Sequence, residues 1–110
     1  MTALNTNMPL NVWGPLFWDW FHNLTICYPN SPTYNQAYET YNKIENFIMN
    51  LPCPHCKNHA IQYINQHPIN LTSNKKFQLW VWNFHNSVNY RTNKPVFSKQ
   101  DYYNKYHQLI

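Results

Sequence analysis

Apolar side chains recur at intervals of three and four residues along most of this sequence, the spacing that places them on one face of an α-helix. The pattern occupies four long segments and one short one, at residues 13–28, 32–51, 53–64, 74–90 and 98–106. On the fourth segment the predicted core face consists of Phe77, Val81, Phe84 and Val88. No segment offers a convincing parallel strand. The pattern therefore predicts an all-α fold, a four-helix bundle with a short fifth helix at the C-terminus.

Turn and capping residues indicate where these helices begin and end. Ser31 followed by Pro32 has the N-cap and N1 pattern of a helix start, and Pro52 ends the same helix. The next helix is expected to begin at Cys53, and "SKQD" at 98–101 has the form of a capping box. Because a helix N-terminus carries unpaired amides and a favourable dipole, we expect it to stabilise a thiolate at Cys53.

The composition supports one packed helical domain. Hydrophobic residues make up 44% of the 110 residues and aromatic residues 18%, which is enough for a single core. One glycine against eight prolines makes a fold with many positive-φ turns hard to build, so helices are favoured over a sheet. We predict a flexible N-terminus at residues 1–11 and a single domain at residues 12–110.

The charge distribution argues against nucleic-acid and membrane partners. Eight Lys and Arg against four Asp and Glu give a net charge of +4, but the cations are scattered rather than gathered on one face. No apolar run approaches the roughly 18 residues of a membrane span. The N-terminal "MTALNTNMPLN" lacks the basic and apolar regions of a secretory signal, so we expect a cytoplasmic protein.

Three cysteines are too few for a disulfide framework, and their positions separate a pair from a single residue. Cys53 and Cys56 belong to "LPCPHCKNHA" at 51–60, whereas Cys27 lies far from them in sequence. We expect Cys27 to be a small buried residue at the end of the first helix. The pair itself has three interpretations: half of a zinc site, a redox-active disulfide, or two buried thiols.

A structural zinc ion needs four ligands, so the cysteine pair would need two more. His55 and His59 lie nearby, but no second Cys or His pair follows, and His85 could join only through the tertiary fold. We therefore expect no metal site. A redox pair needs only two sulfurs able to bridge and a helix N-terminus that favours the thiolate. The alternative to an enzyme is a non-enzymatic zinc-binding or protein-interaction helical module.

A redox pair also needs an electron acceptor, and two groups of side chains suggest where one would bind. Trp18 and His22 lie four residues apart and share a helix face. The fourth predicted helix, at residues 74–90, and the segment after it offer rings, amides and cations. These are Trp82, His85, Asn86, Asn89, Arg91 and Lys94. An aromatic stripe on a helix more commonly belongs to a core. Together, however, these side chains predict a dinucleotide site between helices. Rings can stack on a heterocycle, amides can hydrogen-bond to its edges, and cations can bind a phosphate.

The same residues match a known family in order and spacing. The matching stretches are "WGPLFWDWFH", "CPHCKNH" and "FQLWVWNFHNSVNYRTNKPVF", and the most specific part is His-Asn-x-Val-Asn followed by Lys-Pro. With them the sequence resembles the Erv/ALR family of FAD-linked sulfhydryl oxidases, especially the short single-domain members of large DNA viruses. The resemblance implies a helical bundle that holds FAD between its helices and assembles as a homodimer.

The resemblance also implies roles for individual residues. Those expected beside the flavin on the first helix are Gly14, Trp18 and His22. Those expected at the adenosine and phosphate part are His85, Asn86, Asn89 and Lys94. Cys56 would face the isoalloxazine, Cys53 would receive the substrate thiolate, and His59 matches a position near the flavin. The implied reaction forms disulfides in a dithiol protein or a thioredoxin-like carrier and passes the electrons to dioxygen, giving hydrogen peroxide.

The sequence departs from the family pattern in two places. Many relatives carry a second, structural disulfide, and the corresponding positions here are Trp82 and Lys99. Neither terminal segment has the further Cys pair that relatives often use as a shuttle. The resemblance therefore suggests a core module that takes electrons directly from its partner, in the host cytoplasm or the virion if the protein is viral.

Overall fold

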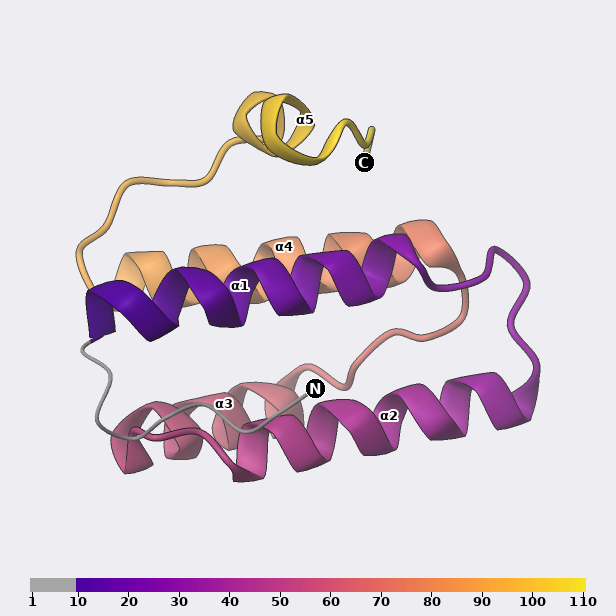
Figure 1. Cartoon of the computed structure of the whole chain (residues 1–110), viewed down its shortest axis with the longest axis horizontal. Coiled ribbons are helices and arrows are strands. Elements are labelled where there is room, and N and C mark those ends of the chain that lie inside the picture. The colour runs from indigo at the N-terminus through magenta and orange to yellow at the C-terminus, as the bar shows by residue number, and fades with distance from the viewer. Residues whose placement is uncertain (1–9) are drawn as a thin grey trace.

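The computed structural model describes residues 10–110, which form five helices (Figure 1). They are α1 (Leu10–Ile26), α2 (Tyr34–Met49), α3 (Pro54–Gln66), α4 (Asn74–Arg91) and α5 (Lys99–Tyr106). The described range contains no strand, so the prediction of an all-α fold is confirmed. Most of the predicted flexible N-terminus, residues 1–9, lies outside the described residues. No described helix is long and apolar enough to cross a membrane.

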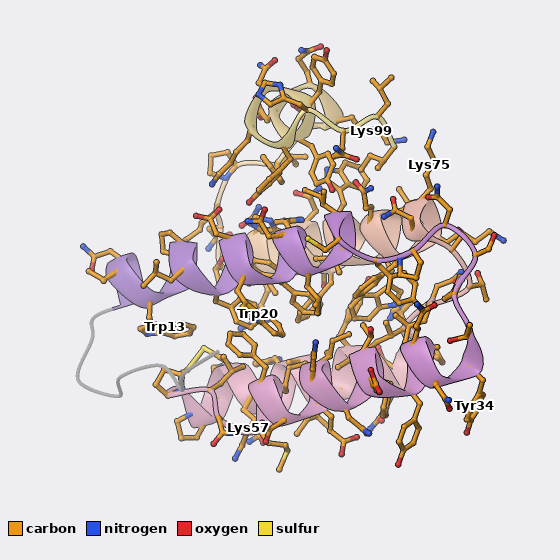
Figure 2. All side chains as sticks on the ribbon, turned by 45° about the vertical axis from the view of Figure 1, so that its right-hand side comes forward. Trp13, Trp20, Tyr34, Lys57, Lys75 and Lys99 are labelled. Carbon is orange, nitrogen blue, oxygen red and sulfur yellow. A yellow bond between two sulfur atoms is a disulfide. The ribbon has the colours of Figure 1, made fainter. Side chains whose placement is uncertain are left out.

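The four long helices form two pairs. α1 packs beside α4 and α2 beside α3, and Figure 1 shows the two pairs stacked on each other with α5 on the outer side of the α1–α4 pair. Figure 2 shows Trp13 and Trp20 pointing from α1 toward the α2–α3 pair, whereas Tyr34 at the start of α2 points outward. Side chains of α1 therefore enter the space between the two pairs.

Aromatic rings make up most of this core. Phe21 of α1 is fully buried and meets Phe84 of α4 edge-on at 6.1 Å between ring centroids. On the other side, Phe47 of α2 stacks on Phe17 at 5.2 Å and on Trp20 at 3.9 Å. Each such ring stabilises the fold by about 1.5–3 kcal/mol when it leaves water. These contacts fix α1 to both of its neighbours.

The buried face of α4 is wider than the sequence predicts. Phe77, Val81 and Phe84 are buried as predicted, but Val88 is only partly buried, and both Gln78 and Trp80 are buried. The indole Nε1 of Trp80 donates to the carbonyl oxygen of His67 at 3.0 Å, and Gln78 Nε2 donates to Asn74 Oδ1 at 2.6 Å. Because α4 has neighbours on several sides, residues beyond a single apolar stripe become enclosed, and their polar atoms find partners there.

The start of α2 differs from the prediction. Thr33, rather than Ser31, is the N-cap: its hydroxyl accepts from the Gln36 amide at 3.1 Å, and Gln36 Oε1 accepts from the Thr33 amide at 2.9 Å. With Ser31 as the cap, the reciprocal position would fall on Tyr34, whose side chain has no such acceptor to return. The capping box satisfies two otherwise unpaired amides and so selects the later start.

Other predicted helix starts are confirmed. Cys53 is the N-cap of α3, and its Sγ accepts from the Cys56 amide at 3.1 Å. Ser73 caps α4, and the predicted capping box of α5 is formed by Ser98 with Asp101. The helix that carries the cysteine pair therefore begins where its local sequence places it.

Three side chains attach α5 to the bundle. Tyr102 is fully buried and donates to Gln78 Oε1 at 2.6 Å, while Tyr106 donates to Asp19 Oδ1 at 2.8 Å. The Nζ atom of Lys105 lies 3.1 Å from the same Asp19 oxygen. Partial burial alone would raise the pKa of Asp19, but the hydrogen bond from Tyr106 and the Lys105 charge outweigh burial and lower it. α5 is thus held by both packing and polar contacts.

Candidate functional site

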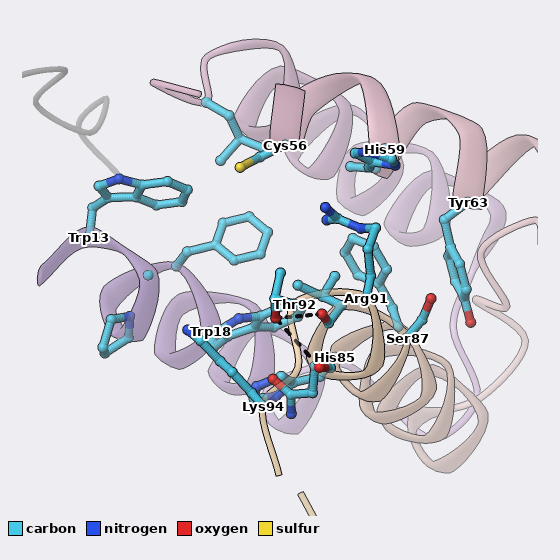
Figure 3. Close-up of a pocket in the computed structure, with 18 of the residues that line it drawn as sticks. Trp13, Trp18, Cys56, His59, Tyr63, His85, Ser87, Arg91, Thr92 and Lys94 are labelled. Atoms are coloured by element: carbon cyan, nitrogen blue, oxygen red, sulfur yellow. Dashed lines mark hydrogen bonds between the residues drawn. The ribbon is translucent and has the colours of Figure 1, made fainter. Parts of the chain in front are cut away.

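A cavity of about 460 Å³ opens between α1, α3 and α4, a volume within the range of small-molecule and cofactor sites (Figure 3). Most of the residues that the sequence nominates line it: Gly14, Trp18, Cys56, His59, His85, Asn89, Arg91 and Lys94. The nominated residues outside its wall are His22, Cys53, Trp82 and Asn86. Three segments far apart in sequence therefore meet around one cavity.

The cysteine pair lies at one end of this cavity. Cys53 and Cys56 are joined by a disulfide, with their Cα atoms 5.2 Å apart. Cys56, in the first turn of α3, lines the cavity, and Figure 3 shows its side chain extending toward the space beside Trp13. Cys53 precedes the helix and is not part of the wall. The two sulfurs thus have different surroundings, one of them directed to the cavity.

The expectation that Cys27 is buried is wrong. Cys27 is free and exposed, because it follows the last residue of α1 and no other element covers it. The thiol has no bridge to the Cys53–Cys56 pair. It is therefore separate from the site.

Trp18 and His85 of the cavity wall, with His22 behind them, connect α1 to α4. The rings of Trp18 and His85 stack 3.9 Å apart at an angle of 6°, and His22 Nε2 lies 2.9 Å from His85 Nδ1. His22 is fully buried, which explains why it contributes to the site only through His85. The resemblance places His22 beside the flavin. In this structure Trp18 and His85 line the cavity and His22 does not, since His22 contacts His85 from behind.

Both histidines are neutral at physiological pH. Burial, followed by the charges of His85 and Lys105, lowers the pKa of His22 from 6.5 to about 3, with Asp19 acting in the opposite direction. Burial, followed by Lys105 and Lys94, lowers the pKa of His85 to about 4. When both rings are neutral, one of the two bonded nitrogens, His22 Nε2 or His85 Nδ1, donates a proton and the other accepts it. The hydrogen bond between the rings therefore needs no buried charge.

Asn86 and Asn89 have different tasks. Asn86 Nδ2 donates to the carbonyl oxygen of Phe97 at 2.9 Å, and Phe97 N donates to Asn86 Oδ1 at 2.7 Å. Both ends of the Asn86 amide are thus used to hold the segment after α4. Asn89 is buried at the cavity wall, and its backbone carbonyl oxygen accepts from the backbone amide of Lys94 at 2.8 Å. The two asparagines together fix the position of Lys94.

Trp82 lies away from the cavity and contacts α5. The Nζ atom of Lys99 is 5.5 Å from the centre of the Trp82 ring, within reach of a cation–π interaction. These are the two positions at which the resemblance suggests a structural disulfide in relatives. In this chain the same two positions are in contact without a covalent bond.

The structure adds residues that the sequence does not nominate. Lys105 of α5 lines the cavity together with Arg91 and Lys94, and Trp13 and Tyr63 contribute further rings to the wall. The sequence pattern assigns no site role to Trp13, and nothing near Lys105 in sequence points to a site. The contact of Lys105 with Asp19 of α1 brings it to the cavity, so only the tertiary fold reveals it.

The chemistry of the wall fits FAD. Trp13, Phe17, Trp18 and Phe84 offer aromatic surface for a fused ring system, and Asn89 and Ser87 offer polar edges. The cations Arg91, Lys94 and Lys105 suit a pyrophosphate. Among the described residues, by contrast, no group of three or more His, Cys, Asp or Glu is placed to hold a metal ion.

A helical bundle with a Cys-x-x-Cys disulfide at the wall of a cofactor-sized cavity defines a thiol–disulfide redox protein. The model of the Erv1/Alr family matches residues 15–107. A FAD-linked sulfhydryl oxidase of African swine fever virus is 41% identical over 98 residues, covering 89% of this chain and 82% of the relative. A putative FAD-linked sulfhydryl oxidase of Invertebrate iridescent virus 6 is 36% identical, covering 83% and 88%.

Solved structures agree with the sequence comparison. The crystal structure of the FAD binding domain of Erv1 from Saccharomyces cerevisiae is similar with a TM-score of 0.84 and 25% identity, covering 91% of this chain and 95% of that one. The yeast Erv1 core gives the same TM-score at 23% identity, which supports the fold. The chain belongs to the Erv1/Alr family.

The buried histidine pair predicts how stability changes with pH. Below pH 6.5 the unfolded chain protonates both rings, whereas the folded chain keeps them neutral to about pH 4. The free energy of unfolding should therefore fall as pH drops from 6.5 toward 4. Replacing His22 with Gln should flatten this slope by up to about 1.4 kcal/mol per pH unit. Urea titrations at several pH values measure it, and an unchanged slope in His22→Gln would contradict the assignment.

Proposed function

We propose that this chain is a FAD-dependent thiol oxidase that forms disulfides in partner dithiols through Cys53 and Cys56. The observation that carries the proposal is the Cys53–Cys56 disulfide at the end of an aromatic, cationic cavity, with Cys56 in the wall. The viral relatives named FAD-linked sulfhydryl oxidases, which this chain matches over most of its length, support the same activity.

The thiol chemistry proceeds by two exchanges. A substrate thiolate attacks Cys53 Sγ, the Cys53–Cys56 bond breaks, and Cys56 leaves as a thiolate. The second substrate thiol, once deprotonated, attacks the substrate sulfur of the mixed disulfide, releasing an oxidised substrate and Cys53 as a thiolate. Two electrons have then passed from the substrate to the cysteine pair. Cys53 is half-buried just before α3 and lies outside the cavity wall, so we assign it the first attack, and the wall position suits Cys56 for the onward transfer.

The N-terminus of α3 helps both steps. The Cys56 amide lies 3.1 Å from Cys53 Sγ, so a hydrogen bond and the helix dipole favour negative charge on that sulfur when Cys53 leaves. FAD bound in this cavity would supply a two-electron acceptor for the reduced pair and the reactivity toward dioxygen that gives hydrogen peroxide. We place its ring system beside Gly14, Trp18, Cys56 and His59, and its phosphates near Arg91, Lys94 and Lys105.

His85 and Asn89 hold the remaining part of the cofactor in this proposal. His85 is fixed by its stack on Trp18 and its bond to His22, so its face is oriented before the cofactor arrives. His22, Asn86 and Trp82 act behind the wall, as supports rather than as contacts. The partner is a dithiol protein or a thioredoxin-like carrier, and a cytoplasmic location stays a prediction.

The cysteine assignments predict a clear difference between single variants. Cys56→Ser should abolish thiol-dependent oxygen consumption, because no disulfide can form with Cys53. Cys27→Ser should keep nearly all of it, because Cys27 is free, exposed and outside the cavity. Oxygen uptake with a small dithiol measures both. A Cys27 variant as inactive as the Cys56 variant would show that the redox pair is misassigned.

The cationic end of the cavity predicts weaker FAD retention in a charge variant. Arg91→Ala with Lys94→Ala removes two exposed side chains and should lower FAD affinity by about tenfold or more, since charged hydrogen bonds are worth about 1.5–3 kcal/mol each. Its melting temperature should recover when FAD is added in excess. The matched control is Lys75→Ala with Lys76→Ala at the other end of α4, outside the cavity. Equal flavin content in both double variants would refute the placement.

We also propose a homodimer that buries the outer face of α1 and α2. Val12 and Leu16 of α1 and Tyr34, Tyr38 and Tyr41 of α2 are exposed, and Figure 1 shows both helices on the same side of the molecule. An apolar surface of this kind supports an interface between copies. Leu16→Glu with Tyr38→Glu should shift the sedimentation coefficient from dimer to monomer. A parent protein that sediments as a flavin-bound monomer at micromolar concentration would refute the proposal.

A further inference from the structure

Two histidines on α3 approach each other in a way that the thiol chemistry does not require. His55 and His59 lie four residues apart on one face of the helix, and their Nε2 atoms are 3.1 Å apart. The rings are nearly perpendicular, at 83°, with centroids 4.4 Å apart. His55 is exposed, while His59 also lines the cavity beside Arg91 (Figure 3).

The distance between the two nitrogens is that of two ligands on one metal ion. Imidazole nitrogens bind a first-row ion at about 2.0–2.1 Å, so two of them lie about 2.9 Å apart at a right angle and about 3.4 Å apart at a tetrahedral angle. The observed 3.1 Å falls between these values. The spacing therefore suits one shared ion, and binding it requires both rings to rotate until their Nε2 lone pairs point at the ion.

We propose that His55 and His59 form a two-imidazole binding site for a divalent first-row transition-metal ion such as Ni²⁺ or Zn²⁺. Without an ion, one Nε2–H donates to the other Nε2. With an ion, both rings carry their proton on Nδ1 and both Nε2 lone pairs bind the metal, so no proton is released from the neutral pair. Water completes the coordination, since the described residues place no third His, Cys, Asp or Glu in the group.

This site is separate from the proposed oxidase function and differs from a cysteine-based zinc site. The sulfurs of Cys53 and Cys56 are bonded to each other in the oxidised protein, so neither is a thiolate ligand. The ligand class follows from the donors, because imidazole suits Ni²⁺, Cu²⁺ and Zn²⁺, whereas Ca²⁺ and Mg²⁺ prefer oxygen. The ion would lie at the start of α3, between solvent and the cavity wall.

The experiment measures Ni²⁺ binding to the oxidised, flavin-containing full-length protein by isothermal titration calorimetry. All variants carry Cys27→Ser, because the exposed Cys27 thiol is itself a metal ligand. The expected result is one site in this parent, with affinity reduced at least about tenfold in both His55→Ala and His59→Ala, because each leaves a single imidazole. The control is His107→Asn, which removes another exposed histidine and keeps a residue that tolerates the left-handed backbone there.

The two ligand variants make the proposal falsifiable even if one of them perturbs the cavity. His55 is exposed and does not itself line the cavity, so His55→Ala removes one ligand without removing a side chain of the cavity wall. If either His55→Ala or His59→Ala binds Ni²⁺ as tightly as the parent, the ion is held elsewhere, for example by cofactor phosphates, and the proposal is wrong. An equal loss in His107→Asn would also overturn it.

Discussion

The packing of α1 against α4 is the constraint on which the rest of this structure depends. Phe21 and Phe84 close the core between the two helices, and Trp18 stacks on His85 at the edge of that core. Aromatic pairs of this kind contribute about 0.5–1.5 kcal/mol beyond the area they bury. The hydrogen bond between His22 and His85 then fixes the relative position of the helices in a place where neither ring is charged.

The site follows from this packing. Sliding α1 past α4 would break the Trp18–His85 stack, so this contact holds the part of the cavity wall that the two helices form. α3 closes the cavity from the opposite side, and its N-terminus carries the cysteine pair. Cys56 lines the cavity and Cys53 does not, and this difference comes from the helix start, since Cys53 precedes the helix and Cys56 lies within its first turn.

α5 shows how a short helix can be held without a covalent link. Its own length is too small for an independent helix to be stable in water. Tyr102, Tyr106 and Lys105 hold it against α1 and α4, and Lys99 adds a contact to Trp82, at the two positions where the resemblance suggests a disulfide in relatives. The same attachment brings the Lys105 cation to the cavity, so α5 contributes both to the stability of the bundle and to the cavity wall.

The sequence by itself determined the helices, the start of α3 at Cys53 and the motif residues that gather at the cavity. These are local properties, because periodicity reports which face of a helix is apolar and capping reports where its amides are satisfied. It did not determine that Trp80 and Gln78 are buried, that Cys27 is exposed, or that Asn86 serves the backbone at Phe97. Those outcomes depend on which elements cover a position, and the bond between His22 and His85 joins residues 63 positions apart. Only the tertiary structure, which sets those neighbours, decided them and brought Lys105 into the site.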